Sequence, residues 1–343
     1  MKEYELGLIV GKFYPFHNGH EYLIRTGLSR SKHLVVAVVA NRKKELISAE
    51  TRSEWIKETF QDLDVRIIED IEDDDNSKAW ADYTRQFLGC VPDAVFTSED
   101  YGVTWAAELG CAHVCVDKAR RTIPISGTLV RSNPFKYWDY LPYPTRRYFT
   151  PRIVLIGAES TGKSTLAEQL AAHYQTNLVH EYGRYYVELQ RHNKDTKLVY
   201  GGLSVAWHEQ DFVNIATTQN LICGQLSANA NKLLICDTDA FATSVWHYRY
   251  TKKWSKKVAR LIKKVPLLYL VTPPDIPFTQ DGTRDGQKIR RNMHQWVLSA
   301  LKRDNRPYHI VEGGLDQQVR LDDAIKAVDS ACQAWVESIG WRE

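Results

Sequence analysis

The stretch IVLIGAESTGKST, residues 153–165, joins an apolar run to the pattern G-x-x-x-x-G-K-S. The run IVLI predicts a buried strand, and the TLAEQLAAHY that overlaps its end has the spacing of an amphipathic helix. Small residues between strand and helix let backbone N–H groups surround phosphates, with Lys163 reaching the β- and γ-phosphates and Ser164 binding Mg²⁺. We therefore predict a phosphate-binding loop that holds ATP through Gly157, Glu159, Ser160, Thr161, Gly162, Lys163, Ser164 and Thr165.

Two acidic segments farther along the chain are candidates for chemistry at that phosphate. KLLICDTDAF, residues 232–241, ends an apolar strand with Asp237 and Asp239, where a Mg²⁺-organising carboxylate is expected. HEYGRYY, residues 180–186, contains Glu181, which could take a hydroxyl proton, and Arg184, which could hold phosphate. The pattern leaves the base open among the three carboxylates. A strand-end turn or a helix-start salt bridge would explain the same residues without chemistry.

The charged segment FTQDGTRDGQKIRRNMH, residues 278–294, has the composition of a lid over a nucleotide. Cations must meet the charge that develops on a transferred phosphoryl group, and two glycines would let such a segment move. A loop of solvated charges is the alternative explanation. The candidate lid residues are Asp281, Arg284, Asp285, Arg290 and Arg291.

In the N-terminal half, GKFYPFHNGH (residues 11–20) places two histidines three residues apart after the apolar run GLIV. Gly19 lets the backbone turn where we expect a helix from His20 to Leu28. Free N–H groups and the dipole at a helix start attract anions, and two imidazole donors beside them would suit a phosphate. A pair of histidines packed in a loop is the alternative.

A second set of anion-binding residues stands about a hundred residues later, in VDKARRTIPISGTLVRSNP (residues 116–134). Ser126, Gly127 and Thr128 combine short hydroxyls with a flexible glycine, and Arg131 adds a fixed cation. At a loop-to-helix junction these residues would bind phosphate and ribose.

Apolar, partly β-branched runs alternate with amphipathic segments, which predicts parallel sheets covered by helices. The stretch YLPYPTRRYFTPR, residues 140–152, has three prolines and no periodicity, and we interpret it as a linker. We predict an α/β protein of two parallel-sheet domains, residues 1–145 and 150–343. The expected strands of the first domain are GLIVG, HLVVAVV, DVRIIED, AVFTS and HVCVD.

Composition restricts the remaining classes of protein. With 343 residues, 43% hydrophobic and 25% charged, the chain is typical of a soluble globular protein of two domains. The longest apolar runs are strand-length, so no membrane span is expected, and the acidic start MKEYE is not a signal peptide. Six cysteines without disulfide-framework spacing favour a reducing cytoplasm, and we interpret Cys111, His113 and Cys115 as strand positions rather than zinc ligands.

The basic run TKKWSKKVARLIKK, residues 251–264, is the candidate for nucleic-acid binding in a chain whose net charge is only +3. The apolar stripe of a helix is formed by Trp254, Val258, Leu261, Ile262 and Val265, which leaves the lysines on a solvated face. We therefore expect no nucleic-acid partner.

The two N-terminal motifs together resemble the signatures of the nucleotidylyltransferase superfamily, H-x-G-H and I-S-x-T-x-x-R, in the expected order. DIEDDDNSKAWADY, residues 70–83, looks like the segment of nicotinamide mononucleotide (NMN) adenylyltransferases whose tryptophan stacks on the nicotinamide ring. FTSEDYG, residues 96–102, looks like the loop on the adenine side. The signatures are matched by His17, Gly19 and His20 and by Ile125, Ser126, Thr128 and Arg131.

Fused to a P-loop domain, residues 5 to about 330 resemble the NadR family of bifunctional NMN adenylyltransferases and ribosylnicotinamide kinases. The resemblance implies a Rossmann-like nucleotidylyltransferase domain, residues 1–145, and a P-loop kinase domain, residues 150–343. The kinase would phosphorylate ribosylnicotinamide with ATP and Mg²⁺, and the other domain would transfer AMP from ATP to NMN, giving NAD and pyrophosphate. A cytoplasmic enzyme with small-molecule partners is expected, without membrane or nucleic acid; a homo-oligomer is left open.

The resemblance also assigns roles to residues. In the first domain, His17 and His20 would stabilise the triphosphate with help from Lys12 and Arg131. In the second, Glu181 of an E-x-x-R motif would be the base, and Ser164 and Asp237 would hold Mg²⁺. The remaining assignments are ATP contacts by Gly11, Phe13, Gly19, Ser126 and Thr128, NMN contacts by Asn76 and Trp80, and ribosylnicotinamide or lid contacts by Arg184, Asp239, Asp281, Arg284 and Arg290.

Two other functions fit the same motifs. One is a nucleotidylyltransferase fused to a nucleoside kinase, both acting on another acceptor. The other is an NAD-sensing regulator, as in family members with a helix-turn-helix domain ahead of the adenylyltransferase motif. Here that motif begins at Gly11, so we expect no repressor role.

Overall fold

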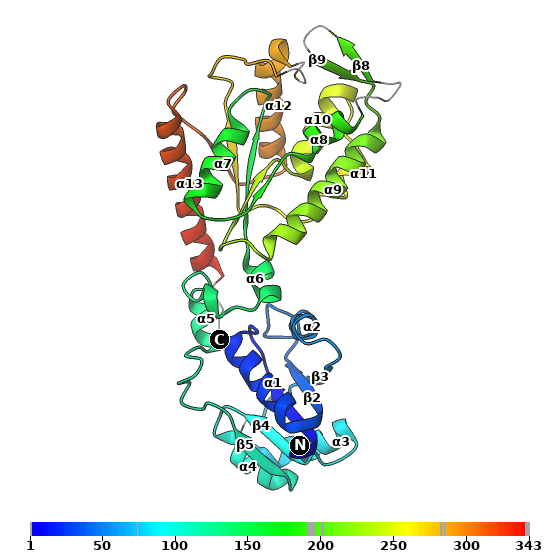
Figure 1. Ribbon diagram of the computed structural model, residues 1–343, viewed down its shortest axis with the longest axis vertical. Coiled ribbons are helices and arrows are strands. Elements are labelled where there is room, and N and C mark those ends of the chain that lie inside the picture. The colour runs from blue at the N-terminus through cyan, green and yellow to red at the C-terminus, as the bar shows by residue number, and fades with distance from the viewer. Residues whose placement is uncertain are drawn as a thin grey trace. The chain divides into compact units, whose positions relative to one another are not determined.

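The computed structural model describes residues 2–73, 75–190, 196–199, 202–281, 284 and 286–339. The chain divides into two compact units, one formed by the residues up to Tyr148 and the other by Phe149–Ser338. The described residues form two five-stranded sheets, one in each unit, and both are parallel throughout. The predicted α/β class with two parallel sheets is therefore confirmed (Figure 1).

The first unit has the strand order β3-β2-β1-β4-β5. Alternate strand residues, among them Leu8, Ala37 and Val95, pack against α3 and α4, while α1 and α2 cover the other face. Because the strand order reverses between β1 and β4, a crevice opens at their carboxyl ends. The elements are β1 (Tyr4–Gly11), α1 (Asn18–Arg30), β2 (Ser31–Ala40), α2 (Ala49–Thr59), β3 (Asp64–Glu69), α3 (Ser77–Leu88), β4 (Ala94–Thr97), α4 (Tyr101–Leu109), β5 (Ala112–Cys115), α5 (Gly127–Ser132), η1 (Trp138–Tyr140) and α6 (Tyr143–Phe149).

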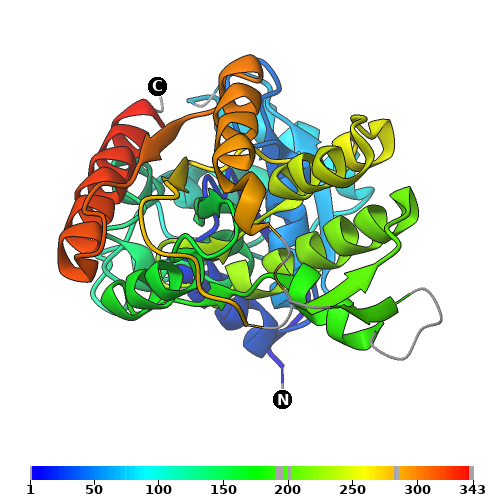
Figure 2. The same cartoon turned by 90° about the horizontal axis from the view of Figure 1, so that it is seen from above.

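The second unit has the strand order β12-β11-β6-β10-β7. Val154 and Ile156 of β6 pack on the face covered by α9, α10 and α12, while Ile153 and Leu155 pack on the face covered by α7 and α13. Helices α7 and α13 lie side by side on that face (Figures 1 and 2). A strand buried on both faces needs a continuous apolar run, which is why IVLI predicted it correctly.

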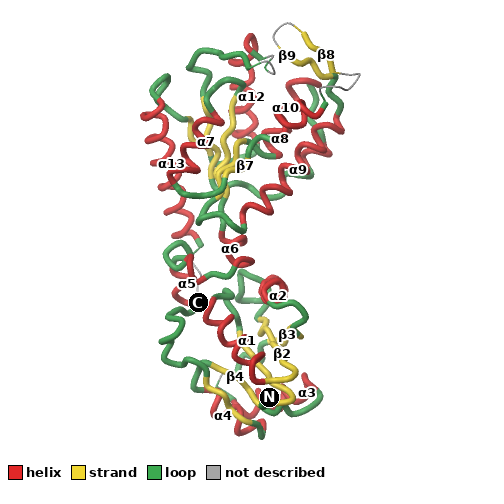
Figure 3. The backbone as a smooth tube through the Cα atoms, viewed as in Figure 1, coloured by secondary structure: helices red, strands yellow, loops and turns green. Residues whose placement is uncertain are grey.

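The elements of this unit, coloured by type in Figure 3, include a separate antiparallel pair, β8 and β9. None of the helices in the described part of the chain combines the length and apolarity needed to cross a membrane. The bounds are β6 (Arg152–Gly157), α7 (Lys163–His173), β7 (Leu178–Val179), α8 (Tyr182–Leu189), β8 (Thr196–Val199), β9 (Gly202–Val205), α9 (Glu209–Ser227), β10 (Leu234–Asp237), α10 (Ala240–Thr251), α11 (Lys256–Ala259), β11 (Leu268–Thr272), η2 (Gln287–Ile289), α12 (Arg290–Arg303), β12 (Tyr308–Ile310) and α13 (Gln317–Ser338).

Two local expectations are corrected. The predicted linker contains helix α6, whose prolines lie before it, in its first turn and after it, where a missing N–H costs little. The basic run 251–264 is not one amphipathic helix, because Lys252 has φ +57° and ends α10, and Ser255 caps the short α11. Trp254 instead lies against the ring of Tyr248, with ring centroids 4.8 Å apart.

Candidate active sites

A cavity of about 770 Å³ opens at the carboxyl edge of the first sheet. It brings together the loop after β1, the end of β4 with residues 98, 99 and 101 that follow it, and the start of α5, as the reversal of strand order predicts. Residues from both sequence motifs line it, although more than a hundred residues separate them. The sequence-predicted residues on its wall are Gly11, Lys12, Phe13, His17, Gly19, His20, Trp80, Ser126, Thr128 and Arg131.

The two histidines form a stacked pair, with ring centroids 3.7 Å apart and planes 13° from parallel. His17 is the N-cap of α1, and its Nδ1 accepts the backbone N–H of His20 at 3.3 Å. Because Nδ1 is the acceptor, the neutral ring carries its proton on Nε2. The expected helix therefore begins at Asn18, two residues earlier than predicted.

Burial, with a smaller effect from the nearby Arg120 guanidinium, lowers the pKa of His17 to about 3. Removal from water also lowers the pKa of His20 well below its usual range, with smaller effects from His17 and Arg120. Both rings are therefore neutral near pH 7. Each can donate one N–H to an anion, and neither brings a positive charge of its own.

The titration of His17 predicts a pH-dependent stability. The unfolded chain, with a histidine pKa of about 6.5, binds more protons than the folded chain between pH 6.5 and about pH 3. The free energy of unfolding is therefore expected to fall as the pH falls through that window, by at most about 1.4 kcal/mol per pH unit. His17→Asn keeps a capping oxygen and should flatten this dependence in urea titrations, whereas His33→Asn, at an exposed histidine, should not. Equal slopes for wild type and His17→Asn would contradict the assignment.

The second motif is tied to the first by direct contacts. Arg131 Nη1 donates to the carbonyl of Tyr14 at 2.7 Å, and Nη2 donates to Thr128 Oγ1 at 3.1 Å. A Cβ at Gly127 would lie 2.5 Å from the Tyr14 carbonyl oxygen, so only glycine lets the start of α5 approach this closely. Ser126 caps α5 by accepting the N–H of Leu129. The motif thus closes one side of the cavity.

Trp80 and Asn76, both predicted to bind NMN, are placed differently. Trp80 is half-buried on the cavity wall, with Nε1 donating to the Asp73 carbonyl at 3.1 Å. The Asn76 side chain caps α3 by accepting the N–H of Ala79, and it donates to Asp73 Oδ2 at 2.9 Å. Asn76 is not among the residues on the cavity wall, and its contacts support the helix that presents Trp80.

Arg52 is a residue of this site that the sequence analysis missed. Its fully buried guanidinium donates to the carbonyls of Lys12 and Val39 and to the Glu45 carboxylate. Glu45 lines the cavity and also accepts the N–H of Asn41. Arg52 therefore fixes the loop after β1 against the end of β2. Its place among the other charges of α2 gave no signal of burial.

A second cavity, of about 340 Å³, lies in the other unit over the predicted phosphate-binding loop. Predicted residues from Glu159 to Thr165 line it, together with Glu181, Arg184 and Arg284. Ser160 and Gly162 have φ values of +56° and +79°, which bend the backbone into a concave loop. A Cβ at Gly157 would lie 2.5 Å from Thr272 Oγ1, which explains the glycine at the end of β6.

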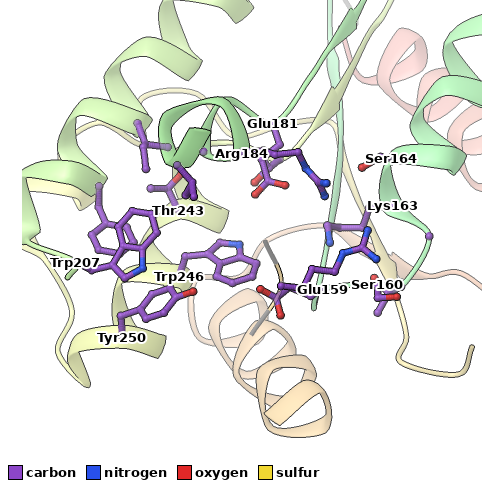
Figure 4. A pocket seen from close by; sticks show the side chains of 18 of the residues that line it. Glu159, Ser160, Lys163, Ser164, Glu181, Arg184, Trp207, Thr243, Trp246 and Tyr250 are labelled. Atoms are coloured by element: carbon purple, nitrogen blue, oxygen red, sulfur yellow. The ribbon is translucent and has the colours of Figure 1, made fainter. Parts of the chain in front are cut away.

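Lys163 and Ser164 of this loop line the cavity together with Glu181 (Figure 4). Lys163 Nζ donates to the Ala158 carbonyl at 2.7 Å, and Ser164 Oγ donates to Asp237 Oδ2 at 2.5 Å. Desolvation and the Asp237 charge raise the pKa of Glu181, and Lys163 and Arg184 oppose that rise. A carboxylate with a raised pKa inside a cavity is suited to accept a proton.

Asp239 and Asp281, two further predicted site residues, have hydrogen-bond or ion-pair partners within the protein. Asp239, buried, caps α10 by accepting the N–H of Ala242 and accepts the Tyr269 hydroxyl at 2.7 Å. Both of its oxygens are thus used inside the fold, and it is not on the cavity wall, so the geometry does not support its predicted substrate role. In the predicted lid, Asp281 pairs with Arg184 at 2.8 Å and with Arg284 at 3.0 Å.

Arg290 was predicted to be a lid cation. Its guanidinium instead donates to the backbone carbonyls of Ser160 at 2.8 Å and Ile276 at 3.0 Å. These hydrogen bonds tie Arg290 to the backbone of the phosphate-binding loop. Of the remaining lid candidates, Arg291 is exposed, and Asp285 lies outside the described residues.

An aromatic wall, formed by Trp207, Phe212, Trp246 and Tyr250, closes the cavity opposite the loop (Figure 4). The rings of Trp207 and Tyr250 have centroids 5.3 Å apart. Arg249 lies over Trp246 and Tyr250 and pairs with Glu159 of the loop at 3.1 Å. This wall was not predicted from the sequence, although Trp246 and Tyr250 are four residues apart and must share one helix face.

Fold and sites together define a two-domain nucleotide-binding protein, with a nucleotidylyltransferase-like Rossmann unit and a P-loop unit. The AAA domain family matches residues 152–318, and the citrate lyase ligase C-terminal domain family matches residues 6–79. These two matches fall on the P-loop and on the H-x-G-H motif.

The similarity to relatives and to solved structures extends over both units. The trifunctional NAD biosynthesis/regulator protein NadR of Escherichia coli is 29% identical over 323 residues, covering 88% of this chain and 77% of that protein. Its counterpart from Salmonella typhimurium is 29% identical over 327 residues, covering 89% and 78%. Over most of its length the chain is therefore similar to proteins named NadR. Crystal structures of a NadR protein with NR, and with NAD and AMP-PNP, share its fold with TM-scores of 0.76 and 0.74 at 22% identity, covering 96% and 97% of both chains.

Proposed function

We propose that this protein carries out two successive steps of NAD salvage. The second unit phosphorylates ribosylnicotinamide with ATP, and the first unit transfers AMP from a second ATP to the resulting NMN. The observation that carries the proposal is the second cavity, where an aromatic wall and the carboxylates Glu159 and Glu181 line the space over a phosphate-binding loop. Asp237 is not on the cavity wall, but its Oδ2 accepts a hydrogen bond from Ser164 of that loop. Aromatic faces and negative charge favour the cationic nicotinamide ring. The relatives named for NAD biosynthesis support the same function.

In the kinase step the 5′-hydroxyl oxygen of ribosylnicotinamide attacks the γ-phosphorus of ATP. Glu181 accepts the hydroxyl proton, the new P–O bond forms NMN, and the bond to the β-phosphate oxygen breaks to release ADP. Lys163 and Arg184 stabilise the charge on the transferred group. Because the transition state is loose, proton removal contributes less than the positioning of charge.

In the adenylyl step a 5′-phosphate oxygen of NMN attacks the α-phosphorus of ATP, and pyrophosphate leaves with NAD as the other product. The nucleophile is already anionic, so no general base is needed. His17, His20, Lys12 and Arg131 stabilise the developing charge, and Trp80 offers a face to the nicotinamide ring.

Magnesium fits the kinase site through Ser164 and Asp237. Asp237 Oδ1 is buried and has no hydrogen-bond partner among the described residues, while Oδ2 accepts from Ser164. No group of three or more His, Cys, Asp or Glu side chains suited to a metal lies in the described part of the chain, so phosphate oxygens and water would complete the coordination. Bound Mg²⁺ would neutralise charge on the phosphates.

The direct test is incubation of the purified protein with ribosylnicotinamide and Mg-ATP, with chromatography of the products. NMN followed by NAD is expected. Other nucleosides and mononucleotides serve as competing acceptors and test the alternative of a different substrate. An absence of turnover with every acceptor, together with tight NAD binding, would favour the NAD-sensing regulator instead.

The proposed roles of Glu181 and Asp237 predict different effects of their variants on the Mg²⁺ dependence of the kinase rate. Glu181→Gln is expected to lower the kinase rate by about 10²-fold without changing the Mg²⁺ concentration that gives half-maximal rate. Asp237→Asn is expected to raise that concentration, because a metal-bearing carboxylate is lost. Rate measured against Mg²⁺ for both variants decides the matter, and a higher metal requirement in Glu181→Gln would reverse the roles.

We place this chemistry in the cytoplasm. All six cysteines, two of them exposed, are free thiols, as a reducing compartment allows.

A further inference from the structure

Arg320, near the start of α13, is a buried arginine that joins three loops of the second unit. Its side chain is about 6% exposed. Nη2 donates to the carbonyl of Thr161 in the phosphate-binding loop at 2.9 Å. Nη1 donates to Asp275 Oδ1 in the loop after β11 at 3.1 Å and to the Gly314 carbonyl in the loop before α13 at 3.2 Å. Arg320 is not on the cavity wall, so it acts on the site through two backbone carbonyls and the Asp275 carboxylate.

The surrounding backbone is built around this side chain. Gly313 has φ +121°, and a Cβ there would lie 2.8 Å from the backbone nitrogen of Arg320 and 2.9 Å from its Cγ. Any other residue at 313 would push the loop away from α13. On the neighbouring peptide of the phosphate-binding loop, Arg290 donates to the Ser160 carbonyl at 2.8 Å. Two guanidinium groups therefore hold two successive carbonyls of the loop.

The two groups of a peptide unit point in opposite directions. Holding the carbonyls of Ser160 and Thr161 behind the loop turns the N–H groups of Thr161 and Gly162 towards the cavity that these residues line. A charged donor on a carbonyl also polarises the peptide and strengthens its N–H as a donor. Because Ser160 is not a glycine and has a φ of +56°, this conformation needs such support.

We propose that Arg320 is a positioning residue for the phosphates of ATP in the kinase site, and that Asp275 orients it. The kinetic part of the proposal rests on the proposed kinase function. The structural part, the orientation of the loop's N–H groups, does not.

The kinetic test compares Arg320→Gln, Arg320→Lys and Asp275→Asn with a control on the same helix, Lys326→Gln, whose side chain is exposed. In Arg320→Gln the KM for ATP in ribosylnicotinamide phosphorylation is expected to rise about 10- to 100-fold, the effect of losing a hydrogen bond from a charged group. The KM for ribosylnicotinamide should stay within about twofold. Arg320→Lys and Asp275→Asn should show smaller rises, and Lys326→Gln none.

Formation of NAD from supplied NMN, which uses the other unit, shows that the first unit is unaffected, and an unchanged KM for ribosylnicotinamide shows that the second unit is folded. An unchanged KM for ATP in Arg320→Gln, or an equal rise in both KM values, would overturn the proposal. Asp275→Asn tests the same interaction with Arg320 in place, so the proposal stays testable in a chain where Arg320→Gln does not fold.

Hydrogen–deuterium exchange of the peptide covering residues 157–166 tests the loop without turnover. In Arg320→Gln its amides are expected to exchange faster, and AMP-PNP should protect them only at higher concentration than in wild type. Exchange identical to wild type would refute the orientation of the loop by Arg320. If wild type fails to phosphorylate ribosylnicotinamide, the proposed function fails, while this exchange measurement still decides the role of Arg320.

Discussion

Replacing Lys163 by alanine is expected to lower the rate of ribosylnicotinamide phosphorylation about 10³-fold. Lys163 Nζ lies on the cavity wall, within 2.7 Å of the Ala158 carbonyl, at the start of α7. In the proposed mechanism its charge meets the transferred phosphoryl group and the β-phosphate, and a neutral residue would not supply that charge. Formation of NAD from supplied NMN should remain within about twofold of wild type, because that site belongs to the other unit.

The measurement follows both products from the same preparation, with NMN formed from ribosylnicotinamide and NAD formed from NMN. Lys302→Ala, at an exposed lysine in the last turn of α12, is the matched control and should leave both rates unchanged. If Lys163→Ala lowered both activities in a chain that remains folded, a single shared site would replace the two-site proposal.

The features that could be predicted from sequence are those whose cause is local. IVLI must be buried on both faces, and the glycines of the loop follow from close backbone approaches, so strand, loop and helix could be placed from one segment. The paired motifs at His17 and Ser126 were predicted to share an anion-binding role, and the cavity brings them together. Parallel order explains why, since the first motif follows β1, the second follows β5, and the carboxyl ends of both strands lie at the same edge of the sheet.

The features that were missed depend on residues distant in sequence. Arg320 reaches Thr161, a partner 159 positions away, and nothing in α13 marks it as the buried member of that pair. Asp239 was grouped with Asp237 because both follow an apolar strand. Its partner Tyr269, 30 positions away, takes it out of the cavity. A short pattern records which side chains are present, while their partners are decided by packing.

Replacing His20 by alanine is expected to lower adenylyl transfer about 10²- to 10³-fold, the effect of losing one preorganised donor to a developing charge. The structure gives a more specific reason for this loss. Because burial and the stacked ring of His17 keep His20 neutral, its contribution is a positioned N–H and not a positive charge. A neutral donor of similar reach should therefore retain part of the activity, and His20→Gln is expected to lie between wild type and His20→Ala.

The experiment measures NAD formation from NMN and ATP, with the kinase rate of the other unit as the folding control. His33→Ala, at an exposed histidine of the same unit, should leave adenylyl transfer unchanged. If His20 acted as a cation, Gln would be as inactive as Ala, and the wild-type rate would rise steeply as the pH falls below 6.5. If it acts as a neutral donor, that acid activation is absent and Gln is intermediate. The two outcomes differ in the pH profile of the wild-type rate and in the order of the rates of wild type, His20→Gln and His20→Ala. Measuring these three proteins therefore decides whether His20 acts as a cation or as a neutral donor.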